Sequence, residues 1–426
     1  MFINLLEKLH RIQDNKILKF IAQSAFLLAI LTEVAIVLID KSSFINPIEG
    51  RLFQITFILC LLKVVLTKYD YKEYLAAFIF CLLGLMVDML GDKNEILRMV
   101  IFVAACKGTD IKKYMKVVLW TTSAGCVLLG ILSIFGILGE VTVLKEYPGS
   151  VFVERYCFGM GNANAFHIMF FALVLLALYL YGERMKWWVY VVLFVGNIIV
   201  TLLTYCKTGA ALTAFAIALM ALVNRFVTNN GSKNGGGSKL KKTIKILCVV
   251  AGPIEVAMSV YFAWISPIMY RHSWGEHDLY EKYKLGIPYF IDRVLTGRIR
   301  SLTYDTKNSG SLETWTFLPN SESVEFFDLG YVRLFYWYGI LAAAVILLLF
   351  LTLKIYLARK GYINELVFLT LIGLFTLVEA HFVSVYIGRC YPLFILGGFW
   401  ASMLTIGNRN RDVQSRGSES FREVNA

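Results

Sequence analysis

Residues 329–353 read LGYVRLFYWYGILAAAVILLLFLTL, an almost uninterrupted apolar run. The hydrocarbon core of a bilayer takes about 20 apolar residues in one helix, so this stretch predicts a membrane-spanning helix. The rest of the chain has the same character, since 58% of its residues are hydrophobic, only 17% are charged and the mean hydropathy is +0.64. This composition excludes a soluble globular domain and predicts a polytopic membrane protein.

The same length criterion predicts an all-α fold with about twelve transmembrane helices. The apolar runs lie at 17–39, 52–67, 74–90, 96–106, 115–138, 164–181, 187–205, 209–227, 244–266, 329–353, 363–380 and 389–406. Lys63 and Asp88 interrupt the second and third runs, and the fourth run is short. The predicted number of transmembrane helices is therefore twelve to within one or two.

Lysine and arginine collect in every second connection between the predicted spans. These groups lie around residues 8–19, 68–72, 107–116, 184–186, 239–245, 354–360 and 409–416. Short cytoplasmic loops are rich in these residues, whereas exported loops lack them, so both termini are predicted to be cytoplasmic. The net charge of +12 follows from this pattern and suits anionic membrane lipids, so no nucleic acid partner is expected.

Polar stretches divide the chain into parts. Residues 1–228 hold the first eight predicted helices, and residues 229–243, which begin NNGSKNGGGS, read as a flexible cytoplasmic linker. Residues 244–408 hold the last four helices together with a large extracytoplasmic loop, 267–328, between helices nine and ten, and residues 409–426 form a cytoplasmic tail. The eight cysteines occur singly, so their spacing predicts neither a disulfide framework nor a metal site. No metal or cofactor is expected.

The large loop is rich in arginine although the predicted topology places it outside. Its segment IPYFIDRVLTGRIRSL (287–302) has apolar residues at roughly helical spacing, which predicts an amphipathic helix on the membrane surface. One interpretation is that its arginines meet lipid phosphates. The other is that Arg298 and one of Arg293 or Arg300 project into a cleft, where a guanidinium group can bind phosphate bidentately.

Two further basic residues lie at the predicted outer ends of spans. Arg155 occurs in ERYCFGMGNANAF, just before the sixth helix, and Lys207 occurs in TYCKTGA, between the seventh and eighth. A single charge near a helix end is commonly explained by snorkelling to the interface. Together with Arg298 these residues indicate an anion-binding site on the outer face.

Acidic residues and one histidine are candidates for proton transfer. Asp328 lies at the junction of the large loop with the tenth span, and Glu379 lies near the outer end of the eleventh. Glu33 and Glu255 fall inside spans, where buried carboxylates are functional or paired. His272 lies in the large loop and is a further candidate proton acceptor.

Short motifs occur in a characteristic order along the chain. They are Arg155, Gly159 and Asn164; Thr204, Cys206, Lys207 and Gly209; Gly297 and Arg298; and Asp328, Gly330 and Tyr331 followed by Gly339 and Ile340. Their order and topology resemble the Wzy-type polymerases of O-antigen and capsular polysaccharide repeat units, which share a superfamily with the O-antigen ligases. Ala163 stands where that family has proline, and Lys207 stands where it has arginine. The resemblance runs from about the third helix to the twelfth.

The resemblance implies a glycosyltransferase of the GT-C type at the outer face of the bacterial cytoplasmic membrane, one that works without a metal. It would transfer a growing glycan from polyprenyl pyrophosphate to a lipid-linked acceptor repeat unit. Its partners would be polyprenyl-pyrophosphate-linked oligosaccharides and membrane lipids, together with a chain-length regulator and a flippase.

This reaction needs positive charge near the departing pyrophosphate and a base for the proton of the acceptor hydroxyl. The residues expected to bind pyrophosphate are Arg155, Lys207 and Arg298, with Arg293 or Arg300 in support. The expected base is Asp328, with His272 and Glu379 as alternatives.

Two other functions remain open at this point. A flippase or other transporter of lipid-linked sugars would also be polytopic and basic, but it predicts charged residues along a cavity that reaches both leaflets. A ligase would use the same site to join a finished glycan to another acceptor. Ligases carry a histidine at the position of Asp328, which favours the polymerase.

Overall fold

The computed structural model describes residue 13 and residues 15–147, 151–228, 236–274, 286–303, 310–380 and 383–405. The first helices are α2 (Lys16–Lys41), α3 (Glu49–Val65), α4 (Tyr71–Gly91), α5 (Glu95–Ala105) and α6 (Ile111–Ile134). A hairpin of β1 (Thr142–Tyr147) and β2 (Val151–Tyr156) leads to α7 (Ala163–Tyr181), α8 (Trp187–Thr204) and α9 (Lys207–Leu222). The later helices are α10 (Gly236–Trp274), α12 (Gly286–Val294), α13 (Arg298–Ser301), α14 (Gly330–Lys360), α15 (Ile363–Val378) and the helix Pro392–Thr405.

The structure confirms an all-α membrane protein. Within the described residues, eight helices are long and apolar enough to cross a membrane. Each of the twelve predicted runs coincides with a helix, but the helices at four of them are shorter than these eight: α3, α5, α15 and Pro392–Thr405. The number twelve and the GT-C type therefore stay predictions.

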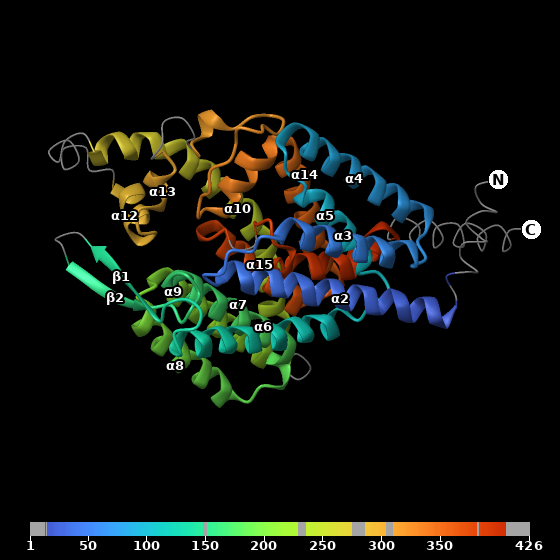
Figure 1. The fold of residues 1–426 in the computed structure, drawn as a ribbon, viewed down its shortest axis with the longest axis horizontal. Helices are drawn as coiled ribbons and strands as arrows, with labels where there is room; N and C mark the ends of the chain where they lie inside the picture. The colour runs from blue at the N-terminus through green and yellow to red at the C-terminus, as the bar shows by residue number, and fades with distance from the viewer. Residues whose placement is uncertain are drawn as a thin grey trace, which may run out of the picture.

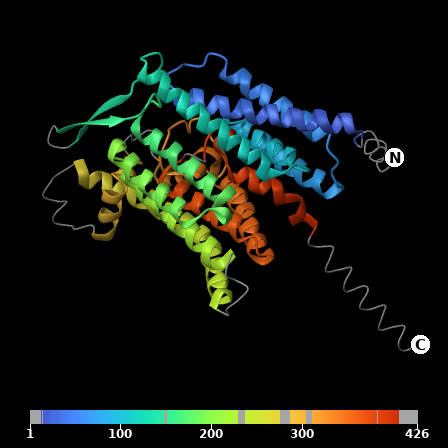
Figure 2. The ribbon, with the colours of Figure 1, turned by 90° about the horizontal axis from the view of Figure 1, so that it is seen from below.

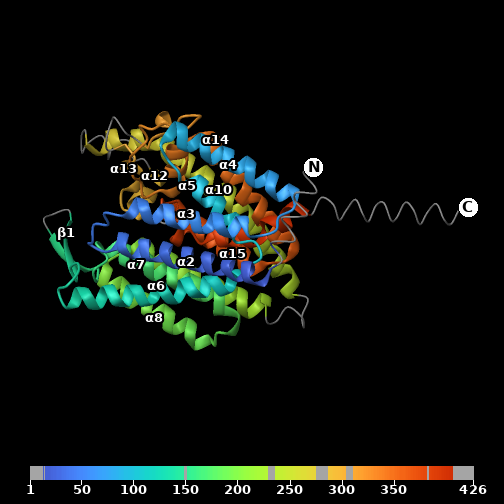
Figure 3. The ribbon, with the colours of Figure 1, turned by 45° about the vertical axis from the view of Figure 1, so that its right-hand side comes forward.

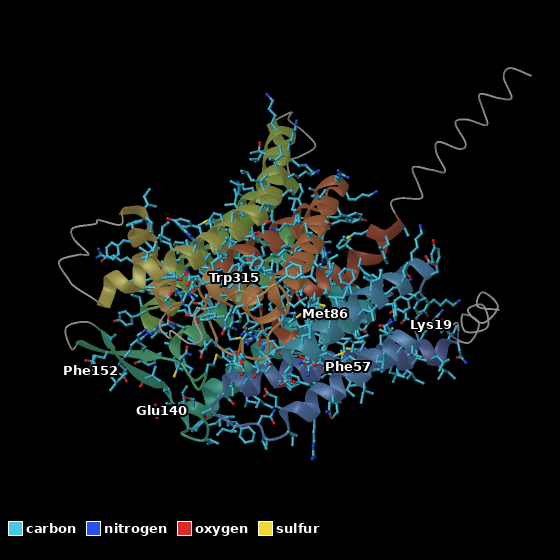
Figure 4. All side chains as sticks on the ribbon, turned by 90° about the horizontal axis from the view of Figure 1, so that it is seen from above. Lys19, Phe57, Met86, Glu140, Phe152 and Trp315 are labelled. Carbon is cyan, nitrogen blue, oxygen red and sulfur yellow. The ribbon has the colours of Figure 1, made fainter. Side chains whose placement is uncertain are left out.

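The helices run side by side between two ends of the molecule (Figures 1 and 3). The start of α2 lies at one end, and the β1–β2 hairpin, α12 and α13 lie at the other, which we call the hairpin end. In Figure 4, Lys19 marks the first end, whereas Glu140 and Phe152 mark the hairpin end. Seen from below, the hairpin projects past the neighbouring helices (Figure 2).

The short helix α15 is the centre of the bundle. Nearly all of its residues are buried, and it packs against α10, α14, α7 and α9. Phe375 of α15 stacks on Phe171 of α7 with ring centroids 4.3 Å apart. A helix that is apolar on all sides is stable only when every side is covered by protein or lipid, and here the protein covers it.

Three regions differ from the sequence-based expectation. The segment between α6 and α7 forms an antiparallel two-stranded sheet, in which Thr142 pairs with Tyr156. The expected amphipathic helix at 287–302 is two short helices, because Thr296 and Gly297 take left-handed φ angles of 58° and 85° and interrupt it. Helix α10 already begins at Gly236, inside the expected linker, while residues 229–235 and the expected tail 409–426 lie outside the described residues.

Helix α14 bends at Gly339, and the bend orients its first segment, residues 330–338. Gly339 has φ 75° and ψ 162°, a backbone conformation that is essentially restricted to glycine. The amides of Ile340 and Leu341 donate to the carbonyls of Thr316 and Phe317 at 2.9 and 3.1 Å, in place of helical partners. The segment before α14 thus satisfies the backbone groups that the bend releases.

We expect Gly339→Ala to destabilise the protein by about 1–3 kcal/mol, because a Cβ atom would lie 2.7 Å from the backbone of Leu318. Thermal unfolding of the purified protein in detergent measures the effect. Gly50→Ala is the matched control, since a Cβ atom at Gly50 meets no atom within 4 Å. Equal melting temperatures for the two variants would contradict the role of the bend.

Candidate functional site

A polar cavity of about 420 Å³ lies where several helices begin or end. Its walls come from the end of α2, the start of α7, the first segment of α14 and the segment that follows α15. The charged residues that line it are Asp40, Lys41, Asp328, Arg333, Glu379 and Arg389. Helix α7 starts just after the β hairpin, so the cavity belongs to the hairpin end of the bundle (Figure 1).

Arg298 brings together three residues that the sequence placed in the site. Its Nε donates to Oδ2 of Asp328 at 3.1 Å, and its Nη2 forms an ion pair with Glu379. The Arg298 and Glu379 side chains are each only 8% exposed, whereas that of Asp328 is 61% exposed. Both carboxylates line the cavity, and Asp328 is the more accessible of the two.

The turn between α12 and α13 positions Arg298. Asp292 is buried, and its Oδ1 accepts the backbone amides of Ile299 at 2.8 Å and Arg300 at 3.3 Å. The Nε of Arg300 pairs with Oδ2 of Asp292 at 3.5 Å. Gly297, with its positive φ, lets the chain turn immediately before Arg298. Arg300 therefore supports the fold of this turn.

Arg155 lies behind the wall of the cavity. It is buried near the end of β2, where its Nε donates to the carbonyl of Thr204 and its Nη2 donates to Oδ1 of Asn164, both at 2.6 Å. Thr204 is the last residue of α8, where a cation is favourable. Asn164 lines the cavity, so Arg155 acts on the site through that residue.

The other expected site residues do not contribute to the described lining. Lys207 is exposed at the first position of α9, and its neighbour Thr208 accepts a hydrogen bond from Arg298 at 3.3 Å. Arg293 is exposed on α12. His272 belongs to the last turns of α10, and its side chain lies outside the described residues.

Arg333 is a site residue that the sequence reasoning missed. It lies on the first segment of α14, where its guanidinium group donates to the carbonyls of Phe327 and Val383. Its guanidinium carbon lies 4.9 Å from the ring centroid of Trp337. An arginine within the apolar run 329–353 was a usable signal, because charges inside such runs usually face a polar cavity.

Arg389, Asp40 and Lys41 were missed as well. Nη1 of Arg389 lies 3.7 Å from Oδ2 of Asp40, and Nζ of Lys41 lies 2.9 Å from the same oxygen. The Nε of Arg389 also donates to Oγ of Ser384 at 3.0 Å. Asp40 and Lys41 end the first helix, and Arg389 opens the last apolar run, so each looked like an ordinary flanking charge.

A buried ion pair beneath the cavity holds the segment that carries Arg389. Nη2 of Arg98 lies 3.4 Å from Oε1 of Glu33, and its Nη1 donates to the carbonyl of Val385 at 3.1 Å. The amide of Gly388 donates to Oε2 of Glu33 at 3.3 Å. This pair, from α5 and α2, fixes residues 385–388 from below. Glu33, a buried carboxylate in the first predicted span, is thus paired.

The lining combines cations, carboxylates and aromatic rings. Phe326, Trp337 and Tyr386 contribute rings, and Asn162 and Asn164 contribute amides. Ligand sites of this kind use apolar and aromatic walls for contact and a few polar groups for orientation. Among the described residues, no group of three or more His, Cys, Asp or Glu side chains is placed to hold a metal ion.

We compared the chain with protein-family models, with curated proteins and with solved structures. No family model matches it, and no curated protein or solved structure matches it.

We expect Arg298→Ala to destabilise the protein by about 3–5 kcal/mol, because it leaves the carboxylate of Glu379 buried without a counter-ion. In the double variant with Glu379→Gln, the orphaned charge is gone, so the loss should be smaller than the sum of the single losses. Thermal unfolding in detergent measures the cycle, and Arg293→Ala serves as an exposed control. Strictly additive losses would show that the two side chains do not interact.

Proposed function

We propose that the protein is a glycosyltransferase that polymerises lipid-linked oligosaccharide repeat units at the outer face of a bacterial cytoplasmic membrane. The observation that carries this proposal is the convergence of Arg298, Asp328 and Glu379 at one polar cavity, from segments 30 and 81 residues apart in sequence. In this proposal the hairpin end faces outward, the opposite end of the bundle faces the cytoplasm, and both termini are cytoplasmic.

The position of the cavity supports an enzyme over a transporter. Its walls are helix ends at the hairpin end, where lipid headgroups meet water. A lipid-linked sugar presents its polar part at this level and keeps its chain in the bilayer. The buried helix α15, which starts from the other end of the bundle, is apolar over most of its length, which disfavours a polar path through it.

In the proposed reaction, one bond to the anomeric carbon forms as another breaks. A hydroxyl oxygen of the acceptor sugar attacks the anomeric carbon of the donor glycan, and the bond from that carbon to the pyrophosphate oxygen breaks. The hydroxyl proton passes to a carboxylate, and the polyprenyl pyrophosphate leaves with the electron pair of the broken bond. Preorganised positive charge stabilises this leaving group.

We assign the proton acceptor to Asp328, because it is the exposed member of the carboxylate pair. Arg298 holds the Asp328 carboxylate through one hydrogen bond and is itself held by Glu379 and Thr208. The earlier assignment of Arg298, Arg155 and Lys207 to pyrophosphate stays a prediction, as does that of Arg293 or Arg300. The rings of Phe326, Trp337 and Tyr386 offer flat surfaces for sugars.

The first test is polymerisation itself. Purified protein in detergent, incubated with a lipid-linked repeat unit of its own organism, should give a ladder of repeat multiples on a sizing gel. Asp328→Asn should lower the rate by about 100-fold or more, since general bases contribute roughly 10²–10⁴. Asp92→Asn is a chemically matched control, since Asp92 is exposed at the end of α4.

Two outcomes would replace the proposal. Transport of the lipid-linked unit across liposomes without any ladder would support the flippase. Transfer of a complete glycan to a different acceptor, again without a ladder, would support the ligase.

The rate of polymerisation should fall as the pH drops below about 7. Burial raises the pKa of Glu379, which lies just after α15, to about 7, while Arg298 opposes the shift and Asp328 adds to it. Above this pH Glu379 is ionised and pairs with Arg298; below it the pair is lost, and Arg298 no longer holds the Asp328 carboxylate as firmly in position.

Initial rates across the range from about pH 6 to about pH 8 test this expectation. Glu379→Gln imitates the protonated form, so it should be slow throughout the range and should lose the midpoint near 7. A wild-type rate that stays constant across the range would show that ionisation of Glu379 is not required.

A further inference from the structure

Three cations from three separate segments line the polar cavity, and we call this group the cationic wall. Lys41 ends α2, Arg333 lies on the first segment of α14, and Arg389 follows α15 in the segment 387–389. The charges of Arg389 and Arg333 both act on Lys41, so the three lie close enough to repel each other. Three converging cations raise the local potential and favour an anion between them.

The carboxylates in the described part of the cavity do not neutralise this wall. Asp40 is the one that pairs with it, through Lys41 at 2.9 Å and Arg389 at 3.7 Å. The other two carboxylates, Asp328 and Glu379, are bonded to Arg298. With Arg298 included, four cations and three carboxylates leave a formal excess of one positive charge at the cavity.

Neutral groups hold the two guanidinium groups in place. Arg333 donates to two main-chain carbonyls and lies against the rings of Trp337 and Phe326, and its Nε is buried without a hydrogen-bond partner among the described atoms. Arg389 donates to Ser384. Such fixation orients the donors without consuming their charge, so they are preorganised for a ligand.

We propose that Lys41, Arg333 and Arg389 bind the pyrophosphate group of a polyprenyl-pyrophosphate-linked glycan, an inference that rests on the function proposed above. A pyrophosphate esterified at both ends carries two negative charges, which the three cations attract. Arginine is suited to this role because its planar donors bind phosphate oxygens bidentately and it stays charged at any working pH. Arg298 then holds the two carboxylates in place, and this second group of cations binds the leaving group.

An adjoining apolar cavity favours a lipid-linked pyrophosphate over the free ion. This cavity has a volume of about 240 Å³ and lies between α4, α5, α14, α15 and Pro392–Thr405. The first segment of α14 faces both cavities, with Arg333 and Trp337 on the polar one and Tyr331 and Leu334 on the apolar one. The segment 383–393 likewise contributes lining residues to both cavities. The headgroup site thus has room for an apolar chain beside it.

Equilibrium binding to the full chain in detergent tests the headgroup site. The probes are undecaprenyl pyrophosphate and inorganic pyrophosphate, without acceptor, so that no turnover occurs. Arg333→Gln and Arg389→Gln should each weaken binding of both probes about tenfold, because each removes a charge-assisted contact. Arg51→Gln is the matched control, since Arg51 is exposed in the first turn of α3, and it should bind as the wild type does.

A second variant tests the chain. Val100 lines the apolar cavity, so Val100→Trp should weaken binding of undecaprenyl pyrophosphate and leave inorganic pyrophosphate unaffected. Wild-type affinity of both arginine variants, with protein that remains monodisperse, would overturn the proposal. Equal affinity for both probes, unchanged by Val100→Trp, would also overturn it, since the site would then take the free ion.

The binding and polymerisation assays separate this inference from the proposed function. Binding that depends on Arg333 and Arg389 in a protein that forms no ladder would contradict the polymerase and leave the anion site in place. Normal ladders from Arg333→Gln and Arg389→Gln would contradict the anion site and leave the polymerase in place.

Discussion

The contacts of Arg298 join parts of the chain that have no other reason to meet. A buried guanidinium group loses its hydration, and that loss is offset only when carboxylates and hydrogen-bond acceptors surround it. Asp328, Glu379 and Thr208 supply these partners from three separate segments. Their geometry fixes the α12–α13 turn over the starts of α9 and α14 and the end of α15. The cavity keeps its shape because these ends are tied to one another.

The bend of α14 also contributes to the shape of the cavity. A straight helix through residues 330–360 would direct its first turns along the bundle, whereas the bend at Gly339 gives residues 330–338 a direction of their own. Tyr331 then donates to Oε2 of Glu255 on α10 at 2.8 Å, and Trp315 stacks on Phe335 with centroids 4.6 Å apart. These contacts fix the helical segment that carries Arg333. Glu255, an acidic residue inside a predicted span, therefore has a structural partner.

The positions of the helices were predictable because the solvent is a bilayer. Every apolar run had to become a helix, since only a helix satisfies its backbone groups within the run, and each predicted run does coincide with one. The hairpin β1–β2 was not predicted because it lies outside those runs. Its signal was present, as TVLKEY and VFVERY are rich in β-branched and aromatic residues and flank a Pro-Gly turn sequence.

The site was predictable only in part, and the reason is physical. Asp328 and Glu379 stood out because they are charges at the ends of apolar runs, and Arg298 because it is an arginine in an outward loop; the three do meet. Lys207 had the same appearance but is exposed, since one residue along a helix turns the side chain by about 100°, and Thr208 takes the inward position instead.

Arg333 and Arg389 show the opposite case. Each was counted as part of a predicted apolar run because its neighbours are apolar, although a charge in such a run has to face a polar cavity or a partner. Their positions are set by the bend at Gly339 and by the Glu33–Arg98 pair, which contacts residues 385–388. Both features depend on contacts between segments that are far apart in the sequence. The spacing of residues along the chain therefore could not predict that these two arginines line the same cavity. The orientation of these two cations is thus decided by the fold rather than by the local sequence.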